Sequence, residues 1–247
     1  MSPSSRASLT YQRYELLRAL RNTRFLLFSL AFPLILFLVI AGPNRHATLG
    51  GIPLPVYYMA GMVAWGAMTA VVAGGGRISM ERAAGWHRQL RLTPLSTSTY
   101  LRAKVLGGYL MAVFTIVLLY AAGIALGVRL PADRWLAMTG LVLVGLVPFA
   151  ALGIWIGHLL APDTLGPAMG GITALFALLG GVWGPLASHG VMLQVVQALP
   201  SYWLVQAGHV AFTGTGWGTR GWLVISAWTV VFAALAARAY QRDTRKL

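Results

Sequence analysis

The amino-acid sequence predicts an all-α polytopic membrane protein with six transmembrane helices. Hydrophobic residues make up 57% of the 247 residues and charged residues only 10%, which leaves too few charges to cover a water-soluble core. About 20 consecutive apolar residues cross the hydrocarbon core of a bilayer. Six stretches approach that length: Phe25–Gly42, Leu54–Gly76, Val105–Val128, Trp135–Leu160, Leu165–Ala187 and Gly221–Tyr240.

The distribution of Lys and Arg predicts the orientation of these spans. Fifteen of the nineteen lie on one side of the predicted membrane, in the N-terminal segment, in the connection 77–104 and in the C-terminal tail. Cytoplasmic connections carry such an excess of cations, so both termini are expected in the cytoplasm. The net charge of +14 reflects this bias and an attraction to anionic membrane lipid, and no nucleic-acid partner is expected. The other side carries Arg45, Arg129, Arg134 and Arg220.

Residues 1–24 precede the first span, and Leu9–Arg24 has the pattern of an amphipathic helix at the inner leaflet. One face carries leucines for the lipid tails, and another carries arginines, three residues apart, for the lipid phosphates. A solvated lead-in is the alternative. The leucines are Leu9, Leu16, Leu17 and Leu20, and the arginines are Arg18, Arg21 and Arg24.

The connection 188–220 precedes the last span. Within it, Val191–Phe212 is nearly long enough to cross the membrane, but it contains glutamines, a histidine and Pro200. Counting it as a span would place the basic C-terminal tail outside, against the distribution of cations. We therefore expect short re-entrant or interfacial outer helices, broken at Pro200. An interfacial tryptophan belt around them would contain Trp183, Trp203, Trp217 and Trp222.

Glycines recur four residues apart along several spans, a spacing that lets helix backbones approach closely in lipid. The pairs are Gly123 and Gly127, Gly153 and Gly157, Gly166 and Gly170, and Gly180 and Gly184. The sequence contains no sign of a soluble domain, so residues 1–247 are expected to form a single membrane-spanning domain.

The sequence does not predict an enzyme. The glycines 74–76 are followed by Arg77-Ile78, where a phosphate-binding loop would have Lys and Ser or Thr. No nucleophile elbow and no pair of carboxylates within a span are found. The chain has no cysteine, and its five histidines are scattered, so no metal or cofactor is expected to be bound by this chain.

All five carboxylates lie at or beyond the ends of the predicted spans. They are Glu15, Glu81, Asp133, Asp163 and Asp243. Carriers driven by protons or sodium usually keep Asp or Glu at membrane depth to bind the ion. A transporter without such a group and without a phosphate-binding loop is expected to take its energy from another polypeptide.

The connection 77–104 is the expected docking site for that polypeptide. Helix formers dominate from Ile78 to Leu92, Pro94 ends this helix, and Ser96–Lys104 leads into the third span. A short charged helix at the membrane face, attached to spans at both ends, suits a mechanical coupling element. A solvated basic loop is the alternative interpretation.

These residues carry a resemblance to a known family. The run Glu81-Arg82-x-x-Gly85-x-x-x-x-Leu90-x-x-Thr93-Pro94-Leu95-Ser96, followed by Leu101-x-Ala103-Lys104, resembles the signature loop of type-2 ABC transporter permeases. The order of elements along the whole chain also resembles that family, closest to its drug and antibiotic exporter branch. Many members have Thr after the loop glycine where this chain has Trp86, a departure that bears on the fit to a particular ATPase.

The resemblance implies a half-transporter of the bacterial cytoplasmic membrane. Two permease subunits, identical or close paralogues, would pair above two copies of a separate ABC ATPase subunit, which would use ATP and Mg²⁺. Glu81 and Arg82 would make charged contacts with the ATPase, Gly85 would allow close approach, and Leu90 would anchor the coupling helix. Thr93 and Pro94 would form the exit turn.

The resemblance further implies export of hydrophobic or amphipathic substrates, which are drugs, antibiotics or lipid-like compounds. An apolar path at the dimer interface would be lined by Met62, Trp65, Met68, Met169 and Phe176. The alternatives are an ion-coupled secondary carrier and a non-transport membrane partner or sensor subunit. Because Glu81 is expected to be solvated at the ATPase interface, Glu81→Ala is expected to leave folding intact.

Overall fold

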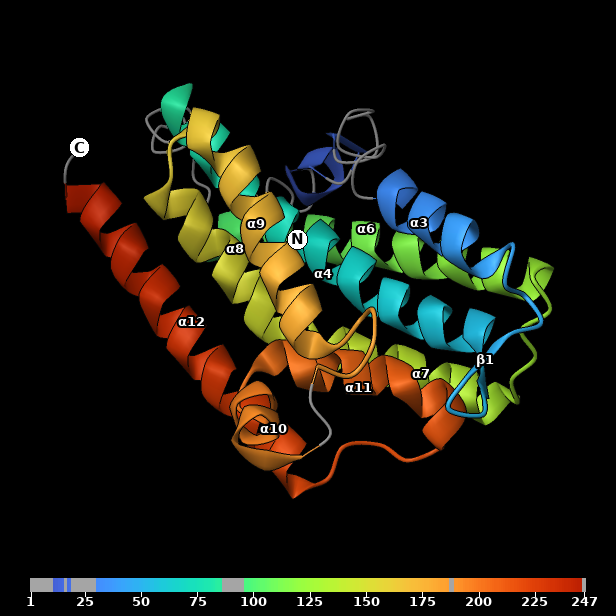
Figure 1. Ribbon diagram of the computed structural model, residues 1–247. Coiled ribbons are helices and arrows are strands. Elements are labelled where there is room, and N and C mark those ends of the chain that lie inside the picture. The colour runs from blue at the N-terminus through green and yellow to red at the C-terminus, as the bar shows by residue number, and fades with distance from the viewer. Residues whose placement is uncertain (1–10, 16, 19–29, 86–95, 187–188, 246–247) are drawn as a thin grey trace.

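The computed structural model describes residues 11–15, 17–18, 30–85, 96–186 and 189–245. This part of the chain is a bundle of helices with one short β-hairpin (Figure 1). The helices are α3 (Phe32–Ala41), α4 (Leu54–Ala83), α6 (Thr97–Ala125), α7 (Ala132–Gly145), α8 (Val147–Leu159), α9 (Pro162–Gly180), α10 (Gly190–Gln197), α11 (Pro200–Thr213) and α12 (Thr219–Arg245). The strands are β1 (Thr48–Leu49) and β2 (Ile52–Pro53).

The bundle has two ends. At one of them, here named the loop end, α4, α8 and α12 finish and α6 and α9 begin (Figure 1). At the other, named the hairpin end, the β1–β2 hairpin lies with α10 and α11 (Figure 1). The hairpin turns at Gly50 and Gly51, whose positive φ angles of 58° and 82° suit a two-residue turn between antiparallel strands.

Five segments are long and apolar enough to cross a membrane, and they overlap five of the six predicted spans. They are Leu54–Ala83, Thr97–Ala125, Ala132–Leu159, Pro162–Gly180 and Thr219–Asp243. The first predicted span is described only from residue 30, as the apolar ten-residue helix α3. A sixth crossing therefore stays a prediction.

The fourth predicted span consists of two helices, α7 and α8, that meet at Leu146. Pro148 lies in the first turn of α8 and has no backbone N–H to donate, which interrupts the helical hydrogen bonds there. The hydroxyl of Tyr109 in α6 donates to the carbonyl oxygen of Leu143 at 3.0 Å, next to this interruption. A break in a helix at membrane depth is tolerated where a neighbouring helix supplies such a partner.

Helix α4 lies at the centre of the bundle and contacts α3, α6, α8, α9 and α11. Three consecutive glycines in it, residues 74–76, each face a different helix. A Cβ on the first would lie 2.7 Å from Cα of Gly108 in α6, one on the second would overlap the backbone of Gly153 in α8, and one on the third would lie 2.6 Å from Sδ of Met169 in α9. This triplet is therefore a packing centre for three helices.

The outer connection contains two short helices with a break between them, and α11 begins at Pro200 as the sequence indicated. Helix α11 packs into the bundle against α4, α7 and α9. Gly208 makes the closest approach, because a Cβ there would lie 2.6 Å from the carbonyl oxygen of Ala60 in α4. This packing favours the re-entrant interpretation of α11 over a purely interfacial one.

Tryptophan side chains donate hydrogen bonds to backbone carbonyls at the break between α10 and α11. The indole Nε1 of Trp203 donates to the carbonyl of Gln197 at 2.8 Å, and that of Trp228 donates to Ala198 at 2.8 Å. Trp217 in turn donates to the carbonyl of Trp203 at 2.8 Å. Trp203 and Trp228 therefore satisfy backbone carbonyls that the end of α10 leaves without helical partners, and Trp203 and Trp217 are two of the residues expected in an interfacial belt.

Candidate functional site

The predicted ATPase-coupling residues fall partly within the described chain. Glu81 and Arg82 lie in the last turn of α4, and Gly85 follows the helix with a φ of 69°, a conformation that glycine adopts without strain. Leu90, Thr93 and Pro94 lie in 86–95, outside the described residues, and so does the predicted coupling helix beyond residue 85.

Glu81 is buried, with 5% of its surface exposed, so the expectation that it is solvated is wrong. Its carboxylate accepts from the hydroxyl of Tyr100 at 2.6 Å and lies 2.5 Å from Nζ of Lys104. Tyr100 and Lys104 are four residues apart on α6 and therefore share a face of that helix. Nη1 of Arg18, from the N-terminal segment, lies 3.2 Å from the same carboxylate.

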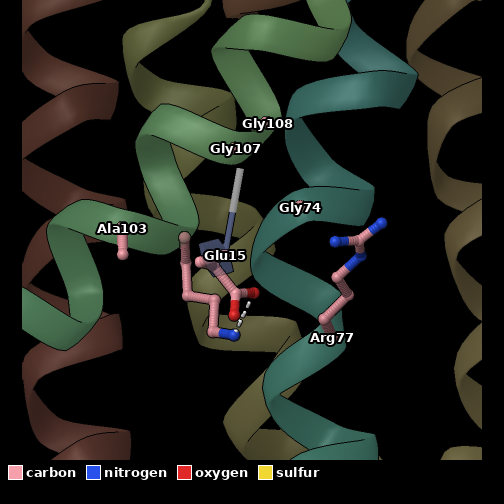
Figure 2. Close-up of a pocket in the computed structure, with 7 residues that line it drawn as sticks. Glu15, Gly74, Arg77, Ala103, Gly107 and Gly108 are labelled. Atoms are coloured by element: carbon pink, nitrogen blue, oxygen red, sulfur yellow. Dashed lines mark hydrogen bonds and ion pairs between the residues drawn. The ribbon is translucent and has the colours of Figure 1, made fainter. Parts of the chain in front are cut away.

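A second carboxylate, that of Glu15, enters this site from the N-terminal segment. Residues 11–15 and 17–18 are helical, and the side chain of Glu15 points to Lys104, whose Nζ lies 2.6 Å from Oε1 (Figure 2). Glu15 and Lys104 are 4% and 1% exposed. A lysine buried this deeply needs carboxylate partners, and Lys104 has two. The predicted amphipathic helix therefore docks on α4 and α6 through charged residues as well as apolar ones.

A small pocket adjoins this pair, between the N-terminal segment, α4 and α6 (Figure 2). Its charged lining residues are Glu15, Arg77 and Lys104, and glycines form much of the rest. Because those glycines have no side chains, the backbones of α4 and α6 come close together directly above the charges.

Arg82 connects the end of α4 to two other helices. Its guanidinium forms a bidentate ion pair with Asp243 of α12, with Nε–Oδ2 at 2.8 Å and Nη2–Oδ1 at 3.0 Å. Nη1 donates to the carbonyl of His158 at 2.6 Å, at the C-terminal end of α8. Nδ1 of His158 lies 2.7 Å from Asp243, which completes the cluster.

Glu81 and Arg82 thus bind the loop end of α4 to four other elements: the N-terminal segment, α6, α8 and α12. The described contacts of both residues are within the chain, so their expected contact with an ATPase stays a prediction. Sequence reasoning missed the partner roles of Glu15, Tyr100, His158 and Asp243. The sequence carried only a general signal, because a buried carboxylate needs a partner but the sequence does not show which carboxylate is buried or which side chain it meets.

The predicted substrate-path residues lie on two helices in contact, α4 and α9. Met62 and Met68 are 0% and 1% exposed inside the core of this chain, so in this structure they line no surface between two chains. Trp65 is also buried, with its ring 5.2 Å from that of Trp183. Met169 and Phe176 of α9 are half-buried.

The charged residues at the loop end and the predicted substrate-path residues do not form a recognisable catalytic or metal site. Within the described chain, no group of three or more His, Cys, Asp or Glu side chains could hold a metal ion. The charged clusters at the loop end are pairs of opposite charge that neutralise one another. Such an arrangement can hold helix ends together, and it can transmit movement from one helix end to another.

The chain is similar to one family of membrane transport proteins. Residues 53–238, from the residue before α4 into α12, match the family described as ABC-2 family transporter protein. Over 229 residues the chain is 30% identical to a protein of Bacillus subtilis (strain 168) that is named as a transport permease, YvfS, and the match covers 90% of this chain and 92% of that relative. The resemblance to type-2 ABC transporter permeases is thereby confirmed, and the chain belongs to the ABC-2 transporter family.

Proposed function

We propose that this chain is the permease subunit of an ATP-driven exporter in the bacterial cytoplasmic membrane. The observation that carries the proposal is the anchoring of the end of α4, which lies directly before residues 86–95 of the connection 77–104. Glu81 and Arg82 hold this helix end to four other elements, so a force applied to the connection reaches the spans through ion pairs and not through a loose hinge. A coupling element between an ATPase and a membrane domain needs such an attachment.

In this proposal two permease chains, identical or closely paralogous, pair in the membrane with both termini in the cytoplasm. Two copies of a separate ATPase subunit bind below them and hydrolyse ATP with Mg²⁺. Leu90, Thr93 and Pro94 form the docking surface of the connection, and Gly85 turns the chain into it. Glu81 and Arg82 hold the helix that carries the docking surface.

The cargo is proposed to be hydrophobic or amphipathic, as drugs, antibiotics and lipid-like compounds are. Each of the five long helices contains an apolar stretch of membrane-crossing length, and the carboxylates in the described chain lie near helix ends, so the bundle offers little to bind an inorganic ion. Met169 and Phe176 on the half-buried face of α9 are the proposed cargo contacts. Met62, Trp65 and Met68 would join them only if α9 moved away from α4.

Co-expression with the ATPase subunit of its own transporter tests the proposal. The two proteins are expected to purify together and to hydrolyse ATP, while the permease alone hydrolyses none because its glycine triplet lacks the Lys and Ser or Thr of a phosphate-binding loop. An ATPase carrying a substitution in its own phosphate-binding loop is the matched control, and it should purify with the permease but show no turnover.

Three outcomes distinguish the proposed exporter from the two alternative functions. Hydrolysis that depends on the ATPase phosphate-binding loop, together with cargo export into vesicles, supports the proposal. Export that runs on a proton or sodium gradient without any ATPase would establish an ion-coupled carrier. Stable binding of the ATPase with no transport under either condition would establish a partner or sensor subunit.

A further inference from the structure

Four side chains at the loop end form a closed ring in which positive and negative charges alternate. Going round the ring, the distances are 2.6 Å from Glu15 to Lys104, 2.5 Å from Lys104 to Glu81, 3.2 Å from Glu81 to Arg18 and 4.0 Å from Arg18 back to Glu15. Three of the four are buried, and only Arg18, with its side chain 55% exposed, reaches solvent. The ring is neutral, as a buried cluster of charges must be to avoid a large desolvation cost.

Two members of the ring are mounted on a rigid base. Glu81 and Lys104 extend from α4 and α6, and these helices meet backbone to backbone at Gly74 and Gly108 (Figure 2). A Cβ at Gly74 would lie 2.7 Å from Cα of Gly108, so the two helices are as close as their backbones allow. Close packing of this kind resists small displacements. The Glu81–Lys104 pair therefore keeps its geometry as long as α4 and α6 stay together.

The other two members come from the short N-terminal segment, residues 11–18. Its contacts with the bundle include the two ion pairs to Lys104 and Glu81, the packing of Tyr11 beside Tyr100 with aromatic centroids 6.4 Å apart, and the pocket that Glu15 lines together with Arg77 of α4. Leu17 on the same segment is 48% exposed. The N-terminal half of the ring can therefore separate from the base without breaking the α4–α6 contact.

The ring also joins the two helix ends on either side of residues 86–95, the part of the connection 77–104 where the proposed function places the docking of the ATPase. Within the connection 77–104, Glu81 lies in the last turn of α4, before residues 86–95, and Lys104 lies in the first third of α6, after them. Each of them is bonded to the other and to the N-terminal segment. Any movement that pulls the end of α4 away from the start of α6 strains the Glu81–Lys104 pair and the two ion pairs by which the N-terminal segment holds these helices.

We propose that the N-terminal segment is a latch across the two helix ends that bear the coupling connection, closed by the ring and opened during the ATP cycle. Glu15 and Arg18 are positioning residues for ATP-driven transport: they act through Lys104 and Glu81 and touch neither nucleotide nor cargo. This inference rests on the proposed function for its link to ATP, whereas the docking of the latch can be measured without an ATPase.

Glu15→Gln is the informative substitution. It removes the charge that holds the latch to Lys104 but leaves Lys104 paired with Glu81, so the base stays neutral and folded. Replacing Lys104 would instead remove the buried cation of the ring, leave the half-exposed Arg18 to face two buried carboxylates, and destabilise the base itself. Arg13→Gln is the matched control, because Arg13 is an exposed charged residue of the same segment. Glu15→Asp tests whether restoring the charge restores the function.

Spin labels can follow the latch directly, since the chain has no cysteine of its own. Cysteines replace Tyr14 on the segment and Met80 on α4, which are 66% and 50% exposed, and the distance between their labels is measured by double electron–electron resonance. In nanodiscs of phosphatidylcholine and phosphatidylglycerol, we expect one narrow distribution for the parent and Arg13→Gln proteins. Glu15→Gln is expected to broaden it, with an open population raised at least about thirtyfold, as loss of a buried charge contact predicts.

The second readout is the stimulation of ATPase turnover by the permease. Glu15→Gln is expected to leave the Kd for the ATPase within about twofold while lowering the stimulated turnover at least about fivefold, because a positioning residue changes kcat more than binding. Glu15→Asp should recover most of it. An unchanged distance distribution in Glu15→Gln would overturn the latch, and a broadened one with unchanged turnover would overturn its positioning role. If the unsubstituted permease binds no ATPase, the proposed function fails while the distance measurement still decides the latch.

Discussion

At the scale of the residue, the structure changes the role of Glu81. The sequence places it at the end of an apolar span and at the start of a basic connection, where a solvated carboxylate is the natural expectation. Burial against Tyr100 and Lys104 makes it instead a member of a neutral cluster. Its neighbour Arg82 faces the other way and binds Asp243, so two adjacent residues of opposite charge fasten one helix end on two sides.

Glu81→Ala is therefore expected to destabilise the protein. Lys104, whose side chain is fully buried, would keep only Glu15 as a partner, and the hydroxyl of Tyr100 would lose its acceptor. Removing one partner from a buried ion pair costs about 3–5 kcal/mol. Thermal unfolding in detergent measures the change. Asp163→Ala, which removes an exposed carboxylate in the first turn of α9, is the control and should cost less than about 1 kcal/mol. Equal unfolding temperatures for both variants would contradict the buried cluster.

The clusters at the loop end could be predicted only in part from the sequence. The motif around Glu81 was recognisable because its residues are close together in the chain. Its partners were not, because Glu15 and Asp243 come from the two opposite ends of the sequence and meet α4 only through folding. Nothing in the local pattern of residues 11–18 distinguishes a helix that docks on protein charges from one that lies on lipid phosphates.

At the scale of the element, the long helices followed from hydropathy, because a bilayer-crossing helix must be apolar over its whole length. Helix partners were harder to predict. Of the glycine pairs with a spacing of four, Gly153 and Gly157 do pack against the backbone of α4, whereas a Cβ at Gly166 or Gly170 would meet nothing within 4 Å. The spacing indicates where a close approach is possible, but the neighbour that uses it is determined by the whole bundle.

Glycine-to-alanine substitutions at two sites, one in the glycine triplet of α4 and one in α7, are expected to change the stability of the protein in opposite directions. Gly75→Ala would force a Cβ into the backbone of Gly153, where no flexible side chain can yield, and should cost about 1–3 kcal/mol or more. Gly140→Ala lies in the interior of α7 with open space around it, and should stabilise by about 0.5–1 kcal/mol because alanine favours the helix. Unfolding temperatures of the two variants measure both changes. A stabilising Gly75→Ala would show that α4 and α8 are further apart than described.

At the scale of the whole molecule, the described contacts bear on the topology. Residues 11–18 are bound to the loop end through Glu15 and Lys104, and the hairpin that contains Thr48 lies at the opposite end (Figure 1). The described part of the first predicted span, α3, leads into this hairpin, and the sixth crossing stays a prediction. The last residues of α12 lie at the loop end beside Arg82, so both ends of the described chain are on the same side.

Single-cysteine labelling tests this topology, again without native cysteines to remove. Cysteines at positions 4 and 244, replacing Ser4 and Thr244, should react with a membrane-impermeant reagent only after the cells are opened. Cysteines replacing Thr48 and Thr215, in the hairpin and in the loop after α11, should react in intact cells because the basic loop end is expected to face the cytoplasm. External labelling at position 244 alone would mean that Val191–Phe212 crosses the membrane. Since α10 and α11 are separate helices of 8 and 14 residues, each shorter than a membrane crossing needs, we expect position 244 to stay protected.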